Sequence, residues 1–448
     1  MMNLGSIGVP VLCKKSATPV LRMPESIRFT SAEAFRHQST MPAGFQMGFL
    51  KMKKTLAALA VLGAFAGSAM AADVTLYGAI DQALSYTYSD VKNFDGSKTV
   101  DGDNKLEMAS GIDTPSRWGI KGVEDLGNGY KVGFKLEGGI NTDDGTMGQD
   151  DRLFGREAAL TVYGPFGELA FGRMGGIGSS AGTYDMLSYV ESFDGGDNAV
   201  WGFSSSDRYD NMITYATPRV AGLQGVVQYS FKMDNVNEDK TTHIEGESTA
   251  DRYLSVGVSG EYGPAQFAVG YELTKYSTTN RVAADKYEPD DKNLVFVGGN
   301  YDFGVAKVFA EAQYFSGARD VFGDLGIDLN DEDYVKVVRT EKGFEGYGLH
   351  LGTVAPVGEG ELTVGLYYVD ATLKDYSVEG VACKDLDGQY YGLAARYGYP
   401  LSTRTKIYVG GGYAEATADE LETREGAKTV SDYKAKVGNV YLGLVHTF

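Results

Sequence analysis

Apolar and polar residues alternate along most of the chain beyond residue 73. At the C-terminal end, Val440, Leu442 and Leu444 share one parity with the terminal Phe448. A period of two predicts a β-strand whose two faces meet different environments. An aromatic residue at the end of such a strand suits the interface between a membrane and water. The pattern therefore favours a β-barrel that crosses an outer membrane, with Phe448 as its C-terminal signal.

The same alternation recurs often enough to predict an all-β fold, a transmembrane antiparallel barrel of 16 strands. An even number of strands is expected of such a barrel. The predicted strands cover residues 74–88, 105–122, 129–141, 152–163, 167–173, 208–217, 222–232, 251–262, 265–276, 292–302, 305–315, 343–354, 360–371, 388–399, 406–416 and 434–448.

The connections between these strands alternate between short and long. The short ones contain tight-turn pairs such as Asn128-Gly129, Gly164-Pro165 and Gly263-Pro264. Glycine, asparagine and proline favour such turns because they supply positive or fixed backbone angles. The long connections are polar and rich in acidic residues. We therefore expect the short turns on the periplasmic side and the long loops outside.

The parity of each strand assigns its residues to lipid or lumen. In the third predicted strand, Val132 and Phe134 face lipid and Lys135 faces the lumen, because a charge near the membrane midplane costs about 2–4 kcal/mol. Arg156 and Arg173 share the parity of apolar neighbours, so we expect them at the rim or beside a bulge. The basic residues of the first half that carry the lumen parity are Arg117, Lys121, Lys131, Lys135 and Arg208.

Residues 174–206 form the longest stretch without a strand pattern between two predicted strands. Such a connection is usually functional or disordered, and the aromatic residues of this one allow it to pack. We expect it to fold into the lumen and narrow it, so that its acids oppose the basic residues of the wall. The alternative is an ordinary external loop. The candidate acidic residues are Asp185, Glu191, Asp194 and Asp197.

The N-terminal region predicts export. Residues 52–71 combine a basic start, an apolar alanine-rich core and the small residues Ala69 and Ala71 around the expected cleavage site. This is the pattern of a secretory signal peptide. Cleavage after Ala71 leaves residues 72–448 as the barrel. Residues 1–51 are an unexplained extension. A translation start at Met47 or Met52 would account for it, and a genuine long leader is the alternative.

Composition narrows the class of protein further. Glycine contributes 60 of 448 residues and tyrosine 30, whereas tryptophan contributes 2. No run of 18 apolar residues follows Ala71, so helical membrane spans are not expected. Without residues 1–71 the chain holds 33 basic and 58 acidic residues, a net charge of −25. Nucleic acid is an unfavourable partner for so acidic a chain.

Two sequence patterns resemble catalytic motifs. Residues 176–181 resemble a dinucleotide fingerprint and residues 178–182 a hydrolase nucleophile elbow. Both need a strand–turn–helix context that the pattern does not predict here. Beyond Ala71 the histidines are His243, His350 and His446, without metal-ligand spacing. We therefore expect no catalytic residue, no metal and no cofactor, and assign His350 to the lumen.

Several segments together resemble the trimeric general porins of neisserial and burkholderial bacteria. They are VTLYG at 74–78, SRWGIKGVEDLGNG at 116–129, FGRE at 154–157, GELAFGR at 167–173 and RYDN at 208–211, together with the final phenylalanine. The resemblance implies a sixteen-stranded homotrimer whose third loop, residues 174–206, folds into the channel. It also implies a basic side of the constriction made by Arg117, Lys121, Lys135, Arg156, Arg173 and Arg208.

The resemblance implies passive diffusion of small hydrophilic solutes and ions across the outer membrane. The expected partners are a homotrimer, outer-membrane lipid and lipopolysaccharide, and the barrel assembly machinery through the C-terminal strand. A solute-specific porin is the alternative within transport. A barrel hydrolase or an adhesin is the alternative outside it. The choice between cations and anions stays open, because the lumen parity is basic while the loops are acidic.

Overall fold

The computed structural model describes residues 73–94, 96, 98–99, 104–193, 200–236, 243–277, 289–325, 338–378, 380–429 and 431–448. The predictions for the N-terminal extension and for the signal peptide fall outside these residues. Among the described residues, no helix is long and apolar enough to cross a membrane.

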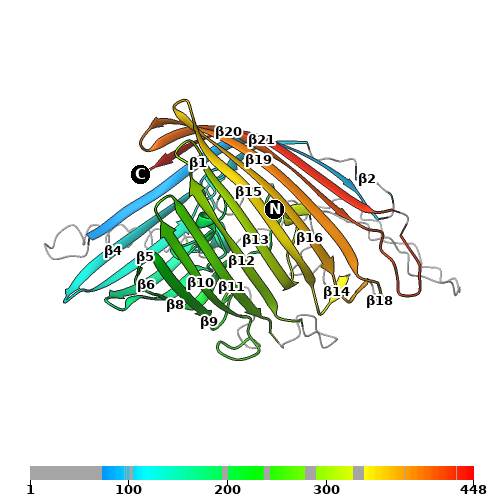
Figure 1. Ribbon diagram of the computed structural model, residues 1–448, viewed down its shortest axis with the longest axis horizontal. Coiled ribbons are helices and arrows are strands. Elements are labelled where there is room, and N and C mark those ends of the chain that lie inside the picture. The colour runs from blue at the N-terminus through cyan, green and yellow to red at the C-terminus, as the bar shows by residue number, and fades with distance from the viewer. Residues whose placement is uncertain are drawn as a thin grey trace, which may run out of the picture. The chain divides into compact units, whose positions relative to one another are not determined.

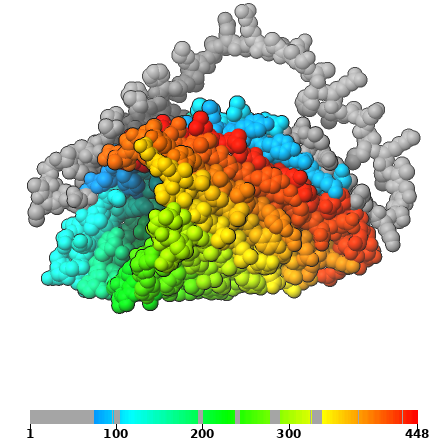
Figure 2. Space-filling view, turned by 45° about the horizontal axis from the view of Figure 1, so that its top comes forward, coloured from blue at the N-terminus to red at the C-terminus, as the bar shows by residue number. Residues whose placement is uncertain are grey.

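The described chain forms a closed barrel of 16 antiparallel strands. Each strand pairs with its neighbours in the chain, and β1 pairs with β21 to close the barrel. Figures 1 and 2 show this closure, because the red residues of β21 lie beside the blue residues of β1. The barrel strands are β1 (Asp73–Lys92), β3 (Lys105–Ser110) with β4 (Arg117–Gly127), β5 (Tyr130–Gly139), β6 (Glu157–Gly164), β7 (Gly167–Gly175), β8 (Arg208–Ala216), β9 (Leu223–Ser230), β10 (Arg252–Tyr262), β11 (Ala265–Lys275), β12 (Lys292–Asp302), β13 (Lys307–Ala318), β15 (Phe344–Val357), β16 (Gly360–Leu373), β19 (Leu386–Ser402), β20 (Thr405–Ala418) and β21 (Tyr433–Thr447).

Two predicted strands differ most from the observed ones, and the others differ by four residues or fewer at either end. The second is interrupted at residues 111–116, so that β3 and β4 pair with β1 one after the other. The fourth begins at Glu157 and not at residue 152. A short helical turn, α2 (Gly148–Asp151), precedes it, and Gln149 and Asp150 have positive φ there. Side-chain parity alone could not detect this turn.

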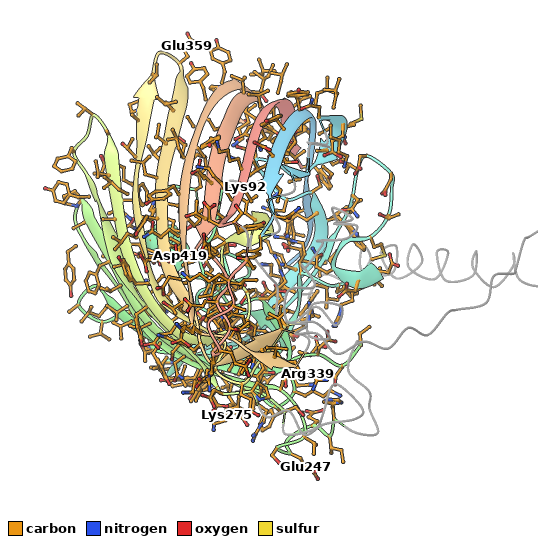
Figure 3. The ribbon with its side chains drawn as sticks, turned by 90° about the vertical axis from the view of Figure 1, so that its right-hand side faces the viewer. Lys92, Glu247, Lys275, Arg339, Glu359 and Asp419 are labelled. Atoms are coloured by element: carbon orange, nitrogen blue, oxygen red, sulfur yellow. The ribbon has the colours of Figure 1, made fainter. Side chains whose placement is uncertain are left out.

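Short and long connections lie at opposite ends of the barrel. Glu359 belongs to the tight turn between β15 and β16, and Figure 3 places it at one end. Arg339 and Glu247 belong to longer connections, Lys275 ends β11 just before another, and all three lie at the other end. The predicted alternation of connection length is therefore confirmed.

The strands have one apolar exposed face and one inward face. On β10, Leu254, Val256 and Val258 are 38–45% exposed, whereas Ser255 between them is fully buried. Exposed aliphatic residues repeat in this way on the strands from β1 to β21. This is the alternation of a transmembrane barrel, whose outer face meets lipid.

The long loops on one side of the barrel also pack together. A three-stranded sheet outside the barrel joins β14 (Val338–Thr340), β17 (Tyr376–Val378) and β18 (Val381–Ala382). A hydrophobic cluster continues from this sheet to the wall and includes Phe322, Phe344 and Tyr390. The backbone of Phe322 donates a hydrogen bond of 2.9 Å to the carbonyl oxygen of Gly202 in the third loop. The long loops at this end therefore contact the segment that sequence analysis assigned to the constriction.

Candidate pore constriction

Loop L3, residues 176–207 between β7 and β8, begins and ends on one buried carboxylate. Glu272 of β11 is 3% exposed and belongs to the inward face. Its Oε1 accepts hydrogen bonds from the backbone of Gly178 at 2.9 Å, from the hydroxyl of Ser206 at 2.8 Å and from the hydroxyl of Tyr253 at 2.5 Å. Glu272 thus joins the two ends of L3 to the wall.

The middle of L3 is attached farther along the same wall. The side-chain amide of Asn300 on β12 donates to the carbonyl oxygen of Tyr189 at 2.8 Å. The hydroxyl of Ser192 donates to the carbonyl oxygen of Val364 on β16 at 2.9 Å, and its backbone N–H donates to Nε2 of His350 on β15 at 3.2 Å. L3 therefore runs across the inward face from β11 to β16.

Glycines of the wall create the space in which L3 lies. A Cβ atom built at Gly352 would lie 2.2 Å from Oγ of Ser192, and one at Gly392 would lie 2.5 Å from the carbonyl oxygen of Val200. Such contacts are too short for a Cβ atom, so only glycine at these positions leaves room for L3. We call this set the glycine track; it comprises Gly257, Gly348, Gly352, Gly365, Gly392 and Gly412, each of which would contact L3 within 3.0 Å.

Three of the predicted basic residues gather around two carboxylates on the wall formed by β4, β5 and β6. Nε of Arg156 lies 2.7 Å from Oε1 of Glu137, and Nε of Arg117 lies 3.9 Å from Oε2 of the same carboxylate. Nζ of Lys135 lies 2.8 Å from Oε2 of Glu157. Arg156 immediately precedes β6, which agrees with the expected place at the rim of a strand.

Lys121 belongs to the same wall but has a different neighbour. Its Nζ lies 5.1 Å from the ring centroid of Tyr77, whose hydroxyl donates to Glu137 at 2.8 Å. The hydroxyl of Thr183 in L3 donates to Oε1 of Glu157 at 2.7 Å. The first half of L3 therefore contacts the wall that carries these basic residues, through Glu157.

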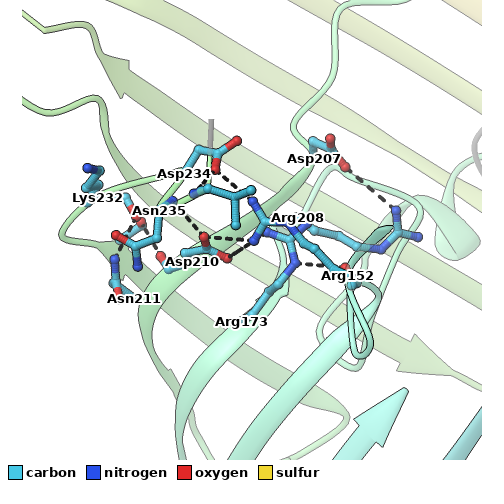
Figure 4. Close-up of polar contacts among 12 residues, drawn as sticks. Arg152, Arg173, Asp207, Arg208, Asp210, Asn211, Lys232, Asp234 and Asn235 are labelled. Carbon is cyan, nitrogen blue, oxygen red and sulfur yellow. Dashed lines mark hydrogen bonds and ion pairs between the residues drawn. The ribbon is translucent and has the colours of Figure 1, made fainter. Parts of the chain in front are cut away.

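Arg173 lies in a separate group of charges, which Figure 4 shows. The ladder between β7 and β8 shifts its register between Gly172 and Met174, so Arg173 sits at a bulge, as parity required. Its NH1 lies 2.7 Å from Oδ1 of Asp210. The same carboxylate binds Arg152 at 2.9 Å, and Arg152 also binds Asp234 at 2.7 Å. We call Arg152, Arg173, Asp210 and Asp234 the latch, because these residues join β7, β8 and two long loops.

The latch raises the pKa of Arg152. Burial disfavours the guanidinium charge, but the hydrogen bonds and charges of Asp210 and Asp234 outweigh it and raise the pKa of Arg152. Arg208 lies nearby, and its NH1 is 3.7 Å from Oδ1 of Asp207. Its Nε is buried, and no described group accepts a hydrogen bond from it. The predicted basic side thus divides between the wall at Glu137 and the bulge at Asp210.

The predicted acidic side is described only in part. Oδ1 of Asp185 accepts the backbone N–H of Leu187 at 2.9 Å. Glu191 is 2% exposed and accepts the indole N–H of Trp201 at 3.0 Å, so it serves the packing of L3. Asp194 and Asp197 lie outside the described residues. The acidic side of a constriction therefore stays a prediction.

Sequence analysis missed Asp113, a carboxylate that pairs with two basic residues. Asp113 projects from the interruption between β3 and β4 and pairs with Nε of Arg396 at 2.9 Å and with Nζ of Lys406 at 2.6 Å. The guanidinium of Arg396 also lies 4.9 Å from the ring centroid of Phe193 in L3. The signal available in the sequence was the pair Gly111 and Pro115, which marks the interruption.

Phe448 takes part in closing the barrel. Its backbone N–H and carbonyl oxygen each form a hydrogen bond of 3.1 Å with Gly78 of β1. A Cβ atom at Gly78 would lie 2.4 Å from the ring of Phe448, so glycine makes room for the ring. The ring is 44% exposed on the outer face, as its parity predicted.

A family model described as Gram-negative porin matches residues 57–419. The chain belongs to this porin family. An outer membrane porin protein of Bordetella pertussis is 32% identical over 392 residues, which cover 81% of this porin and 94% of the relative. The porin is therefore an outer-membrane diffusion channel.

Solved structures share the fold of this porin. An anion-selective porin from Comamonas acidovorans has a TM-score of 0.55 and 24% identity, covering 84% of this porin and all of that chain. A trimer form of the outer membrane protein OmpT of Vibrio cholerae has a TM-score of 0.51 and 16% identity, covering 84% and 100%. These similarities show the barrel fold alone.

Proposed function

We propose that this porin is a passive channel for small hydrophilic solutes and ions, filtered by size and charge where L3 narrows the lumen. The observation that carries the proposal is the attachment of L3 to the inward face, from Glu272 on β11 to Val364 on β16. A loop held across the wall occupies space that the barrel would otherwise leave to water. No reaction and no cofactor belong to this proposal.

We further propose that the filter favours anions. Among the described residues, Arg117, Lys135 and Arg156 share two wall carboxylates, Glu137 and Glu157. Lys121 lies over the ring of Tyr77, and Arg208 lies 3.7 Å from Asp207. Five of the predicted basic residues thus have three neighbouring carboxylates. A charged lumen raises the local concentration of ions of the opposite sign. The anion-selective character of the Comamonas acidovorans porin supports this direction.

The assembly and export of the porin complete the proposal. The trimer form of the Vibrio cholerae protein supports a homotrimer. We propose residues 52–71 as a signal peptide, lipopolysaccharide and outer-membrane lipid as the surroundings, and the C-terminal strand with Phe448 as the part recognised by the barrel assembly machinery.

The purified porin in a planar bilayer should conduct, and a salt gradient should give a reversal potential of the sign produced by anion flow. Partial compensation by Glu137 and Glu157 should keep its size well below the roughly 59 mV per tenfold gradient of a perfectly selective pore. Glu137→Gln should increase the size of this reversal potential.

Three other outcomes would change the proposal. A current that saturates with solute concentration would favour a solute-specific porin. A reversal potential of the opposite sign would refute the anion preference, and a folded protein that does not conduct would refute the channel.

Gly392→Ala tests whether the glycine track determines the position of L3. The new methyl group would lie 2.5 Å from the backbone of Val200, an overlap that typically costs about 1–3 kcal/mol. We expect L3 to move away from the wall into the lumen, and the single-channel conductance to fall.

Gly398→Ala is the matched control, because it lies on the same face of β19. There a Cβ atom would meet only the Lys406 side chain at 4.0 Å. Its conductance should equal that of the unchanged porin. Equal conductance of both variants would show that the track does not control the width of the channel.

A further inference from the structure

The point at which L3 meets β15 contains a histidine whose two ring nitrogens have different partners. Nδ1 of His350 lies 3.1 Å from the carbonyl oxygen of Leu366, which can only accept a hydrogen bond. Nε2 lies 3.2 Å from the backbone nitrogen of Ser192, which can only donate one. Nδ1 must therefore carry the proton and Nε2 the lone pair. This arrangement exists only for the neutral imidazole.

His350 is enclosed at this point. It is 3% exposed, and its ring centroid lies 4.6 Å from that of Tyr367 on β16. The next residue of L3, Phe193, packs over Gly365 on one side and Arg396 on the other. Two consecutive residues, Ser192 and Phe193, thus attach L3 to the wall here, and we call them the tip of L3. Of their contacts, the hydrogen bond from the backbone of Ser192 to His350 is the one that depends on a titratable group.

We propose that His350 is a positioning residue of the channel: its neutral imidazole fixes the tip of L3 through Ser192, and protonation of Nε2 releases that tip. A proton on Nε2 would point at the N–H group of Ser192, so that two donors face each other and the bond is lost. The inference rests on the proposed function, because it takes L3 as the element that sets the channel width.

Other titratable groups face His350 from each neighbouring element. Glu311 lies directly opposite it in the ladder between β13 and β15 and is 4% exposed. Glu191 precedes Ser192 in L3 and lies beside Glu311. Tyr367 comes from β16 and Arg396, through Phe193, from β19. Ionised carboxyl groups here favour the imidazolium, so the pH of release depends on Glu311 as well as on His350.

The hydroxyl of Ser192 limits the size of the effect. Its Oγ lies 3.4 Å from Nε2, so it can accept a hydrogen bond from the imidazolium and retain one contact after the backbone bond is lost. Loss of one hydrogen bond should change the balance between fixed and released tip about fivefold. Ser192→Ala also removes the hydrogen bond to the carbonyl oxygen of Val364, so the released tip should be more populated in this variant at every pH.

The test uses single-channel recording of the full trimeric porin at pH values from about 8 to about 3, because burial of the ring disfavours the charged imidazolium. Three replacements separate the possible causes. In His350→Gln, the amide oxygen takes the place of Nε2 and accepts from Ser192 at every pH. In His350→Leu, no acceptor remains. In Glu311→Gln, the neighbouring carboxyl group no longer titrates.

Release of the tip should appear as current levels that differ from the main open level at neutral pH. We expect the time that the unchanged porin spends in these altered levels to rise about fivefold on acidification. His350→Gln should abolish this rise, His350→Leu should show the altered levels already at neutral pH, and Glu311→Gln should only shift the midpoint. A rise that persists in His350→Gln, or that is absent from the unchanged porin, overturns the inference although the channel conducts. A folded trimer without any conductance at neutral pH would refute the proposed function instead.

Discussion

Replacement of Glu272 by alanine should release both ends of L3 from the wall. The change leaves the backbone N–H of Gly178 and the hydroxyls of Ser206 and Tyr253 without their common acceptor. Each buried donor left unsatisfied costs about 1–3 kcal/mol. L3 should then detach, the single-channel current should become larger and noisier, and chymotrypsin should cleave L3, which contains aromatic residues but no lysine or arginine.

Glu272→Gln is the control for this experiment. Its amide oxygen can still accept from Gly178 and Ser206, so most of the attachment should survive. Partial recovery of resistance to chymotrypsin and of a steady current is expected. If Glu272→Ala conducts and resists cleavage like the unchanged porin, then the remaining contacts of L3 hold it without Glu272, and the carboxylate is not its principal anchor.

The barrel itself could be predicted from the sequence because a transmembrane strand has a simple physical signature. Lipid on one side and water on the other force a period of two, which is visible at Val440, Leu442 and Leu444. The order and pairing of the strands followed from the short turns between them. Even the failure of parity at Arg173 was informative, since it coincides with the bulge between Gly172 and Met174.

The arrangement of the site could not be predicted in the same way, because it depends on contacts between residues far apart in the chain. Lumen parity identified Arg117 and Lys135, but not that Glu137 and Glu157 would pair with them. It also treated Glu191 as a candidate pore acid, whereas this side chain is buried against Trp201. Parity gives the face of a residue and says nothing about its partner across the lumen.

The glycine track shows a related limit. Glycine is abundant in the sequence, which by itself suggests only flexible or tightly turning backbone. Gly352 and Gly392 lie instead within regular strands, β15 and β19, on the face that receives L3. Glycine inside a strand indicates close approach of another backbone. That principle identifies candidates in the sequence, but only the structure shows that the approaching segment is L3.

The latch at Asp210 should contribute strongly to the stability of the rim that carries the long loops. Asp210 is 6% exposed and binds Arg152, Arg173 and the backbone N–H of Asn235. Removal of one partner from a buried ion pair typically costs about 3–5 kcal/mol, because the remaining charges stay buried without compensation. Asp210→Ala should therefore lower the urea midpoint of unfolding in lipid vesicles and weaken the attachment of both loops.

Two further variants distinguish a specific latch from a general effect of surface charge. Asp432→Ala removes an exposed ion pair with Lys92, whose partners are 58% and 37% exposed, and should leave the midpoint unchanged because solvent screens such pairs. Asp210→Asn retains an oxygen acceptor but not the charge, so its midpoint should lie between those of Asp210→Ala and the unchanged porin. Equal midpoints for Asp210→Ala and Asp432→Ala would mean that Arg152 and Arg173 find other partners or reach water. The rim would then owe its stability to the packing of the loops and not to the latch.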